Sequence, residues 1–208
     1  MIEPYRNNLI RIDKHWTRFE IVSLSSRYDI KTFIETGTHI GETILAMSQC
    51  EVFDQIHTIE ISPDAVEFLK TRFVKFADSQ NISLDNVVIY HGDSTAILPE
   101  ILTKDIGRSF FWLDAHYSGE GSGKKENENC TILKELESLK TSPIKDHVIG
   151  IDDIDQCVEK ASDYPSLEEI EKAIYSINKD YSISIKYNVL WAEVPSSLRR
   201  FHPKRLHG

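Results

Sequence analysis

Short apolar runs alternate with amphipathic stretches along most of the chain, a pattern that is typical of α/β proteins. Five runs rich in β-branched and aromatic residues begin near residues 32, 55, 87, 110 and 147, and stretches with helical spacing lie between them. Two further segments, 181–187 and 189–192, are separated by one residue and predict an antiparallel hairpin. We therefore predict a Rossmann-like, seven-stranded, mostly parallel sheet with a C-terminal antiparallel hairpin and helices on both faces.

The helical stretches carry start signals and apolar faces. Ser62 and Pro63 predict the start of one helix, and residues 166–169 form a capping box that predicts the start of another. The apolar face of the first helix is predicted to comprise Val66, Phe68, Leu69, Phe73 and Phe76. Residues 5–27 have mostly helical spacing, and within them we expect Trp16 to pack in the core; the alternative is that Trp16 and His15 line a substrate pocket.

A length of 208 residues fits one domain with a full core. We expect residues 1–208 to form a single domain, with a helical segment at 1–27 and a loosely held basic tail at 195–208. Residues 118–129 contain three glycines and many charged side chains, so they predict a loop. That loop is either a lid over a site or a solvated connection.

The first predicted strand leads into a glycine-containing turn. Thr32, Phe33 and Ile34 form the apolar run, and Glu35 stands at its end. Gly37 and Gly41 follow and lead into a helical stretch at residues 43–47. Strand, glycine turn and helix let the backbone approach a ligand closely at the carboxyl end of the strand. The glycine spacing differs from the Gly-x-Gly-x-x-Gly of dinucleotide-binding proteins, which counts against NAD.

Acidic residues also close the next two predicted strands. Glu60 ends the second strand, 19 residues after Gly41. Nucleotide-binding α/β proteins place a carboxylate at about this distance to accept hydrogen bonds from ribose hydroxyls. Asp93 and Ser94 follow the third strand, where the same residue types also suit the start of a helix.

Three more acids follow the fourth and fifth strands, Asp114 after the fourth and Asp152 and Asp153 after the fifth. Adjacent strands lie about 4.8 Å apart, so three carboxylates at these ends would repel one another unless a cation lay between them. Oxygen ligands favour Mg²⁺, Ca²⁺ or Mn²⁺, and Mg²⁺ is the first candidate. The alternative is that one Asp caps a helix and the others are solvated.

The first three strand ends together resemble the motifs of the class I S-adenosylmethionine (SAM)-dependent methyltransferases, and the resemblance covers residues 28–194. It implies SAM as cofactor, and it implies that the acid after the third strand, here Asp93, meets the adenine amino group. The cofactor-binding residues that it predicts are Glu35, Gly37, Thr38, Gly41, Glu60, Asp93 and Ser94.

A second, narrower resemblance concerns Asp114 and the pair Asp152-Asp153, which look like the metal-binding acids of the macrocin/TylF-like, metal-dependent sugar O-methyltransferases. It implies that these three residues hold a metal ion and that the acceptor is sugar-like. Residues 115–119 depart from the usual continuation in those enzymes, which leaves the substrate class open.

The two resemblances together imply an enzyme that transfers a methyl group from SAM to a hydroxyl of a sugar or another small molecule, with help from a divalent cation. A base must remove the hydroxyl proton, and the candidates are His116 and Asp114. We favour His116, because an ordinary histidine pKa of about 6.5 suits the task and a metal-bound aspartate is a poor base. A SAM-binding module without catalysis and an NAD-dependent oxidoreductase remain as alternatives.

Composition narrows the class of partner. A net charge of −9 argues against general nucleic-acid binding, because phosphate contacts need Lys and Arg. No apolar run approaches the roughly 20 residues of a membrane span. Cys50, Cys130 and Cys157 form no CxxC pair, which predicts reduced thiols in a cytoplasmic protein. We therefore expect a small-molecule or glycan acceptor, no nucleic acid and no membrane, and leave homo-oligomerisation open.

Overall fold

The computed structural model describes residues 14–114, 130–158 and 164–198. The strands are β1 (Thr32–Thr36), β2 (Gln55–Glu60), β3 (Val87–His91), β4 (Ser109–Leu113), β5 (Val148–Ile151), β6 (Ser182–Lys186) and β7 (Val189–Glu193). The helices are α1 (Lys14–Arg27), α2 (Glu42–Ser48), α3 (Pro63–Gln80), α4 (Ser94–Leu102), α5 (Ile132–Leu139), α6 (Asp155–Val158), α7 (Leu167–Ile177) and the 3₁₀ turn η2 (Ser196–Leu198). His116, the predicted loop at 118–129 and the part of the predicted tail from 199 onward lie outside the described residues.

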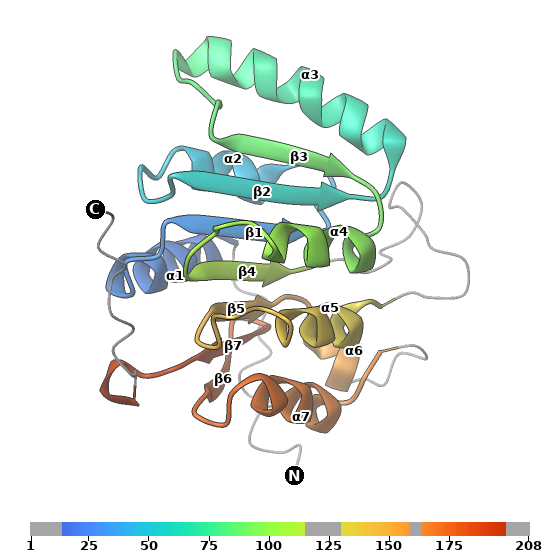
Figure 1. The fold of residues 1–208 in the computed structure, drawn as a ribbon. Coiled ribbons are helices and arrows are strands. Elements are labelled where there is room, and N and C mark those ends of the chain that lie inside the picture. Colours follow the sequence, from blue (N-terminus) through green and yellow to red (C-terminus); the bar gives the residue numbers. More distant parts are fainter. Residues whose placement is uncertain (1–13, 115–129, 159–163, 199–208) are drawn as a thin grey trace.

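All seven strands form one sheet in the order β3-β2-β1-β4-β5-β7-β6 (Figure 1). The strands β1 to β5 run parallel, whereas β7 pairs antiparallel with both β5 and β6. The predicted mostly parallel sheet with a C-terminal antiparallel hairpin is confirmed. None of the helices in the described part of the chain is both long and apolar enough to cross a membrane.

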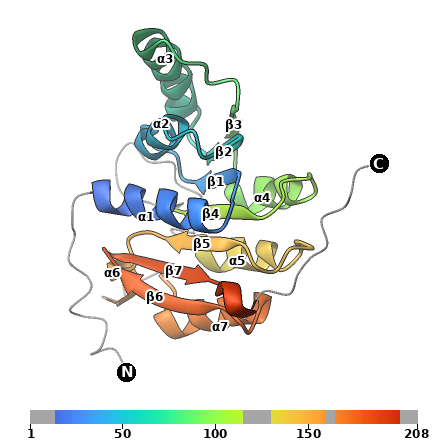
Figure 2. The same ribbon diagram turned by 90° about the vertical axis from the view of Figure 1, so that its left-hand side faces the viewer.

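Helices cover both faces of the sheet, with α1, α2 and α3 on one face and α4, α5 and α7 on the other (Figure 2). Successive side chains of a strand point to opposite faces. Thus Phe110 and Trp112 of β4 belong to the core beneath α1, α2 and α3, while Phe111 and Leu113 belong to the core beneath α4, α5 and α7. Burial on both faces explains why β4 is apolar throughout.

The predicted helix starts are confirmed. The Ser62 hydroxyl accepts a hydrogen bond from the Ala65 N–H (3.3 Å) and caps α3. Ser166 and Glu169 form both hydrogen bonds of the capping box at the start of α7. The predicted apolar face of α3 is wrong at Phe68, whose exposed fraction is 52%. The buried side chains Val66, Leu69 and Phe73 form one helical stripe, and Phe68 projects away from it.

The prediction that Trp16 packs in the core is also wrong. Its exposed fraction is 54%, and its ring contacts the exposed Phe19 edge to face. The inward stripe of α1 consists of Thr17, Ile21 and Leu24, which are spaced for one helical face and are buried. Trp16 precedes that stripe by one position and therefore lies off it.

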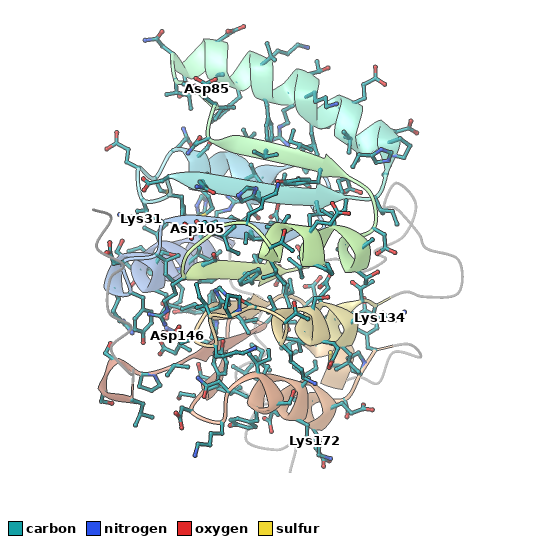
Figure 3. The ribbon with its side chains drawn as sticks, viewed as in Figure 1. Lys31, Asp85, Asp105, Lys134, Asp146 and Lys172 are labelled. Carbon is teal, nitrogen blue, oxygen red and sulfur yellow. The ribbon has the colours of Figure 1, made fainter. Side chains whose placement is uncertain are left out.

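The parallel part of the sheet has an amino edge, where its strands begin, and a carboxyl edge, where they end. Lys31, Asp105 and Asp146 come just before β1, β4 and β5 and lie at the amino edge, away from the arrowheads (Figure 3). The residues that follow the strands lie at the opposite, carboxyl edge. All the described residues that the sequence nominates for SAM or metal binding lie at or next to that carboxyl edge.

The turn between β1 and α2 is confined by its backbone and by α3. Gly37, His39 and Gly41 all have positive φ, at 80°, 49° and 77°. A Cβ at Gly41 would lie 2.5 Å from Leu69 Cδ2 and 2.9 Å from Phe73 Cε1, both on α3. Gly41 is therefore required both for its left-handed conformation and for the close approach of α3.

We predict that Gly41→Ala lowers the free energy of unfolding by about 2–4 kcal/mol, measured by urea denaturation. Gly107→Ala is the matched control, because Gly107 also has positive φ (60°) but a Cβ there would meet nothing within 4 Å. The free energy of unfolding of the control should fall by only about 1–2 kcal/mol, the cost of placing an alanine in the left-handed conformation. Equal losses in the two variants would contradict the role assigned to the contact with α3.

Candidate functional site

Backbone hydrogen bonds tie each strand end of the carboxyl edge to its neighbour. The residues that follow β1, β3, β4 and β5 each donate their N–H to a carbonyl at the end of an adjacent strand: Gly37 to Ile59 (3.0 Å), Gly92 to Glu60 (2.9 Å), Asp114 to Thr36 (3.1 Å) and Asp152 to Leu113 (3.1 Å). The sheet register therefore brings the predicted SAM-binding and metal-binding residues to one edge.

Glu35 lies beneath the glycine turn. Its carboxyl is buried and accepts a hydrogen bond from the Thr58 hydroxyl (2.8 Å), which in turn lies 2.5 Å from the Thr38 hydroxyl. Burial raises the pKa of Glu35 well above its usual value, and Asp114 and Glu60 raise it further, against the hydrogen bonds to Thr58 and Thr43. Glu35 is thus linked to the turn through the hydroxyls of Thr58 and Thr38.

Glu60 joins the turn to the start of α3. One carboxylate oxygen accepts the His39 N–H (2.8 Å) and the other accepts the Ser62 N–H (2.9 Å). The side chain is nearly fully buried at the end of β2. A carboxylate has about four acceptor positions, so these two bonds leave it able to accept hydroxyls of a vicinal diol as well.

The side chains of Asp93 and Ser94 both make hydrogen bonds at the start of α4. Asp93 Oδ1 accepts the Thr95 N–H (2.9 Å) and the Thr95 hydroxyl (2.8 Å), so it caps α4. The buried Ser94 hydroxyl donates to Glu135 (2.5 Å). Both residues lie at the carboxyl edge, and their contact with a cofactor stays a prediction.

Glu135 is a buried carboxylate that the sequence analysis missed. It projects from α5 and is fully buried. Its Oε1 accepts the hydroxyls of Ser94 and Thr131 (3.0 Å), and its Oε2 accepts that of Thr36 (3.3 Å). Burial is the main cause that raises its pKa to about 7, and Asp93 raises it too, against the three hydroxyl bonds. The missed signal is its spacing, three residues after the buried Ile132 and on the apolar face of α5.

The acids after β4 and β5 do not form the predicted three-carboxylate group. Asp114 and Asp152 follow the paired residues Leu113 and Ile151, and both side chains are half-buried. Asp153 has positive φ (49°), and its Oδ1 accepts the Asn188 amide (3.3 Å). Across residues 14–114, 130–158 and 164–198, no group of three or more His, Cys, Asp or Glu side chains is placed to hold a metal ion.

Asn188 is a second residue that the sequence analysis missed. It lies in the turn between β6 and β7, is buried and has positive φ (62°). Its amide donates to Asp155 Oδ1 (2.9 Å) as well as to Asp153, and its carbonyl oxygen Oδ1 accepts the Asp155 N–H (2.9 Å). The hairpin therefore holds the loop after β5 in place.

Comparison with known proteins supports the fold. No family model and no curated protein matches the sequence. A putative caffeoyl-CoA O-methyltransferase from Staphylococcus aureus is similar in structure, with a TM-score of 0.58, 16% identity and coverage of 93% of this chain and 92% of that one. The O-methyltransferase from Bacillus cereus in complex with SAH has a TM-score of 0.60 and 15% identity, covering 93% and 87%.

The O-methyltransferase TomG from Streptomyces achromogenes, in complex with SAM, has a TM-score of 0.55 and 14% identity, covering 88% of this chain and 81% of its own. At these identities the likeness establishes the fold, which is the Rossmann-like methyltransferase fold with its antiparallel C-terminal hairpin.

The Glu135 pKa predicts how stability changes with pH. Because the pKa is about 7 in the folded protein and 4.5 ordinarily, the folded state holds a proton that the unfolded chain has released between these values. The stability contribution is therefore present below pH 4.5 and is lost as pH rises through 7. Glu135→Gln should gain up to about 3 kcal/mol over the wild-type protein between pH 4.5 and 8 in urea unfolding. A difference that is constant with pH would contradict this.

Proposed function

We propose that this protein is a SAM-dependent methyltransferase that transfers the methyl group to a hydroxyl of a sugar or another small molecule. The observation that carries the proposal is Glu60, a carboxylate at the end of β2 that also holds the glycine turn through the His39 N–H. A carboxylate that can accept hydrogen bonds from a diol therefore lies beside a backbone turn at the carboxyl edge, where α/β proteins bind nucleotides. The structural likeness to O-methyltransferases supports the same conclusion.

Charge at the carboxyl edge favours a cationic cofactor. Five acids lie at strand ends on this edge or within two residues after them: Glu60, Asp93, Asp114, Asp152 and Asp153. SAM carries a positive sulfonium, so a concentration of carboxylates attracts it and favours it over the anionic pyrophosphate of a dinucleotide. The site contrasts with phosphate-binding turns, in which the negative charge belongs to the ligand.

Methyl transfer needs alignment of an acceptor oxygen with the methyl group and removal of its proton. Asp114 follows β4 at the middle of the edge, next to the turn that follows β1, because its N–H donates to the Thr36 carbonyl. We propose that Asp114 and His116 lie on the acceptor side, with His116 as the base.

We further propose that a divalent cation takes part in the methyl transfer. Carboxylate oxygens suit Mg²⁺, which often binds one or two carboxylates and keeps several waters. Asp114 and Asp152, on neighbouring strand ends, would hold it. Asp152 Oδ1 accepts the Asp153 N–H (2.9 Å), and Asp153 Oδ1 accepts the Asn188 amide from the β6–β7 turn. When bound, the cation would lower the pKa of the acceptor hydroxyl.

The proposed function is tested by incubating the protein with methyl-labelled SAM and a panel of glycan and small-molecule acceptors. We predict transfer of label to an acceptor hydroxyl. SAM binding without transfer to any acceptor would favour a binding module, and binding of NAD⁺ in place of SAM would favour an oxidoreductase.

For the cofactor site, we predict that Glu60→Gln raises the Kd for SAM about tenfold, because one acceptor oxygen of the proposed ribose contact is lost. Calorimetry should show no change for Glu67→Gln, an exposed residue of α3. Glu60→Gln turns an amide NH₂ toward one of the two bonded N–H groups, and Glu60→Ala would leave both of them unpaired, so urea unfolding must show that Glu60→Gln is folded before its Kd is compared. Unchanged SAM affinity in Glu60→Gln removes Glu60 from the site.

For the cation, Asp152→Asn and Asp153→Asn form a matched pair. We predict that Asp152→Asn lowers Mg²⁺ affinity and turnover at least about tenfold with SAM affinity unchanged. Asp153→Asn should retain most of both, since its remaining oxygen can still accept the Asn188 amide. Chelated wild-type protein should lose turnover and regain it with Mg²⁺. Full turnover after chelation would exclude the cation.

A further inference from the structure

The Glu135 carboxylate accepts hydrogen bonds from a hydroxyl of β1, a hydroxyl of α4 and a hydroxyl just before its own helix, α5. Thr36 is the last residue of β1, Ser94 is the first residue of α4, and Thr131 directly precedes α5. Their oxygens lie between 2.5 and 3.3 Å from the Glu135 carboxylate. The carboxylate therefore fixes the start of α4 and the end of β1 relative to α5, at the carboxyl edge of the sheet.

Packing alone does not require a carboxylate at this position. The neighbours of Glu135 on the same helical face are Ile132, Leu136 and Leu139, which are buried in the core with Ile170 and Ile174 of α7. An apolar side chain would continue that core, whereas an ionised carboxylate in the interior must be stabilised by hydrogen bonds. Ionisation of the carboxylate at this position therefore costs folding free energy, which the three hydroxyl bonds offset in part.

The partners of Glu135 connect both sides of the proposed active site. Ser94 adjoins Asp93, the residue proposed to meet the adenine. The Thr36 hydroxyl also accepts the Asp114 N–H (3.3 Å), and Asp114 lies on the proposed acceptor side. A change in the Glu135 bonds therefore reaches the cofactor side through Ser94 and the acceptor side through Thr36.

We propose that Glu135 is a positioning residue whose ionised form holds the start of α4 and the end of β1 in the arrangement that binds SAM. This inference rests on the proposed function. The ionised carboxylate accepts all three hydroxyl bonds. A protonated carboxyl must donate one hydrogen bond, so one of the three hydroxyls must reverse its direction, and the remaining bonds lose the strengthening that a negative charge gives them. Protonation also removes a negative charge near a cationic cofactor.

The charged groups around Glu135 support a transition near neutral pH. Asp93, which caps α4, raises its pKa, while α7 contributes the apolar Ile170 and Ile174 on the other side of α5. Thr36 faces it from β1, and the end of β4 contributes the acidic Asp114, linked through its backbone to Thr36. Burial among these groups brings the pKa to about 7, so both protonation states are populated under ordinary conditions.

The test compares SAM affinity in the wild-type protein and in Glu135→Gln from pH 6 to 8.5. Gln has the shape of Glu and mimics its protonated form. At pH 6 the two proteins should bind SAM with nearly equal affinity, and at pH 8.5 the wild-type protein should bind about tenfold more tightly. The control is Glu137→Gln, an exposed residue of the same helix that pairs with Lys140. Its Kd should follow the wild-type value at every pH.

Two results would overturn the inference alone, with the wild-type protein still binding SAM. One is equal affinity of wild type and Glu135→Gln at every pH. The other is a ratio of affinities that does not change with pH, which would indicate a purely structural role. Failure of the wild-type protein to bind SAM would overturn the proposed function and this inference together. Ser94→Ala adds a second readout: combined with Glu135→Gln at pH 8.5, it should weaken binding by less than the product of the single effects.

Discussion

Buried carboxylates hold the carboxyl edge of this sheet together. Glu35 lies under the glycine turn, Glu60 joins that turn to α3, and Glu135 joins β1, α4 and α5. Each is stabilised by hydroxyls or backbone N–H groups, so each depends on the correct placement of several elements at once. A buried carboxylate whose donors move is strongly destabilised, and this dependence couples the edge to the fold.

That construction also relates stability to the proposed chemistry. Burial raises the pKa of both Glu35 and Glu135, which means that ionising them costs folding free energy. An edge that concentrates negative charge is unfavourable for the empty protein and would become favourable on binding of the proposed sulfonium cofactor. Functional sites commonly carry such a cost, which the apolar cores on both faces of the sheet offset.

The fold could be predicted from the sequence because its signals are local and periodic. The apolar run of β4 and the close spacing of β6 and β7 predicted a parallel interior and an antiparallel hairpin, and both are confirmed. Trp16 and Phe68 were assigned wrongly because a large apolar side chain near a helical stripe looks like part of it. The likeness of the strand ends to methyltransferase motifs nominated the candidate cofactor-binding residues, and the sheet places them at one edge. Their contacts with a ligand stay predictions.

The tertiary partners of the site could not be predicted in the same way. Glu135 lies on an apolar helical face, and its carboxylate accepts hydrogen bonds from hydroxyls that are 41 and 99 residues away in sequence. Asp153 was assigned to a metal from its position after β5, yet its oxygen accepts Asn188 from the β6–β7 turn, 35 residues later. Neither pairing leaves a periodic signal, because both depend on how the sheet closes.

The most direct measurement is calorimetric titration of the wild-type protein with SAM and, separately, with NAD⁺. We predict saturable, one-to-one binding of SAM and no binding of NAD⁺, because the edge is acidic and its turn lacks the dinucleotide glycine spacing. Binding of NAD⁺ without SAM, or of neither, would contradict the assignment of this edge as a SAM site.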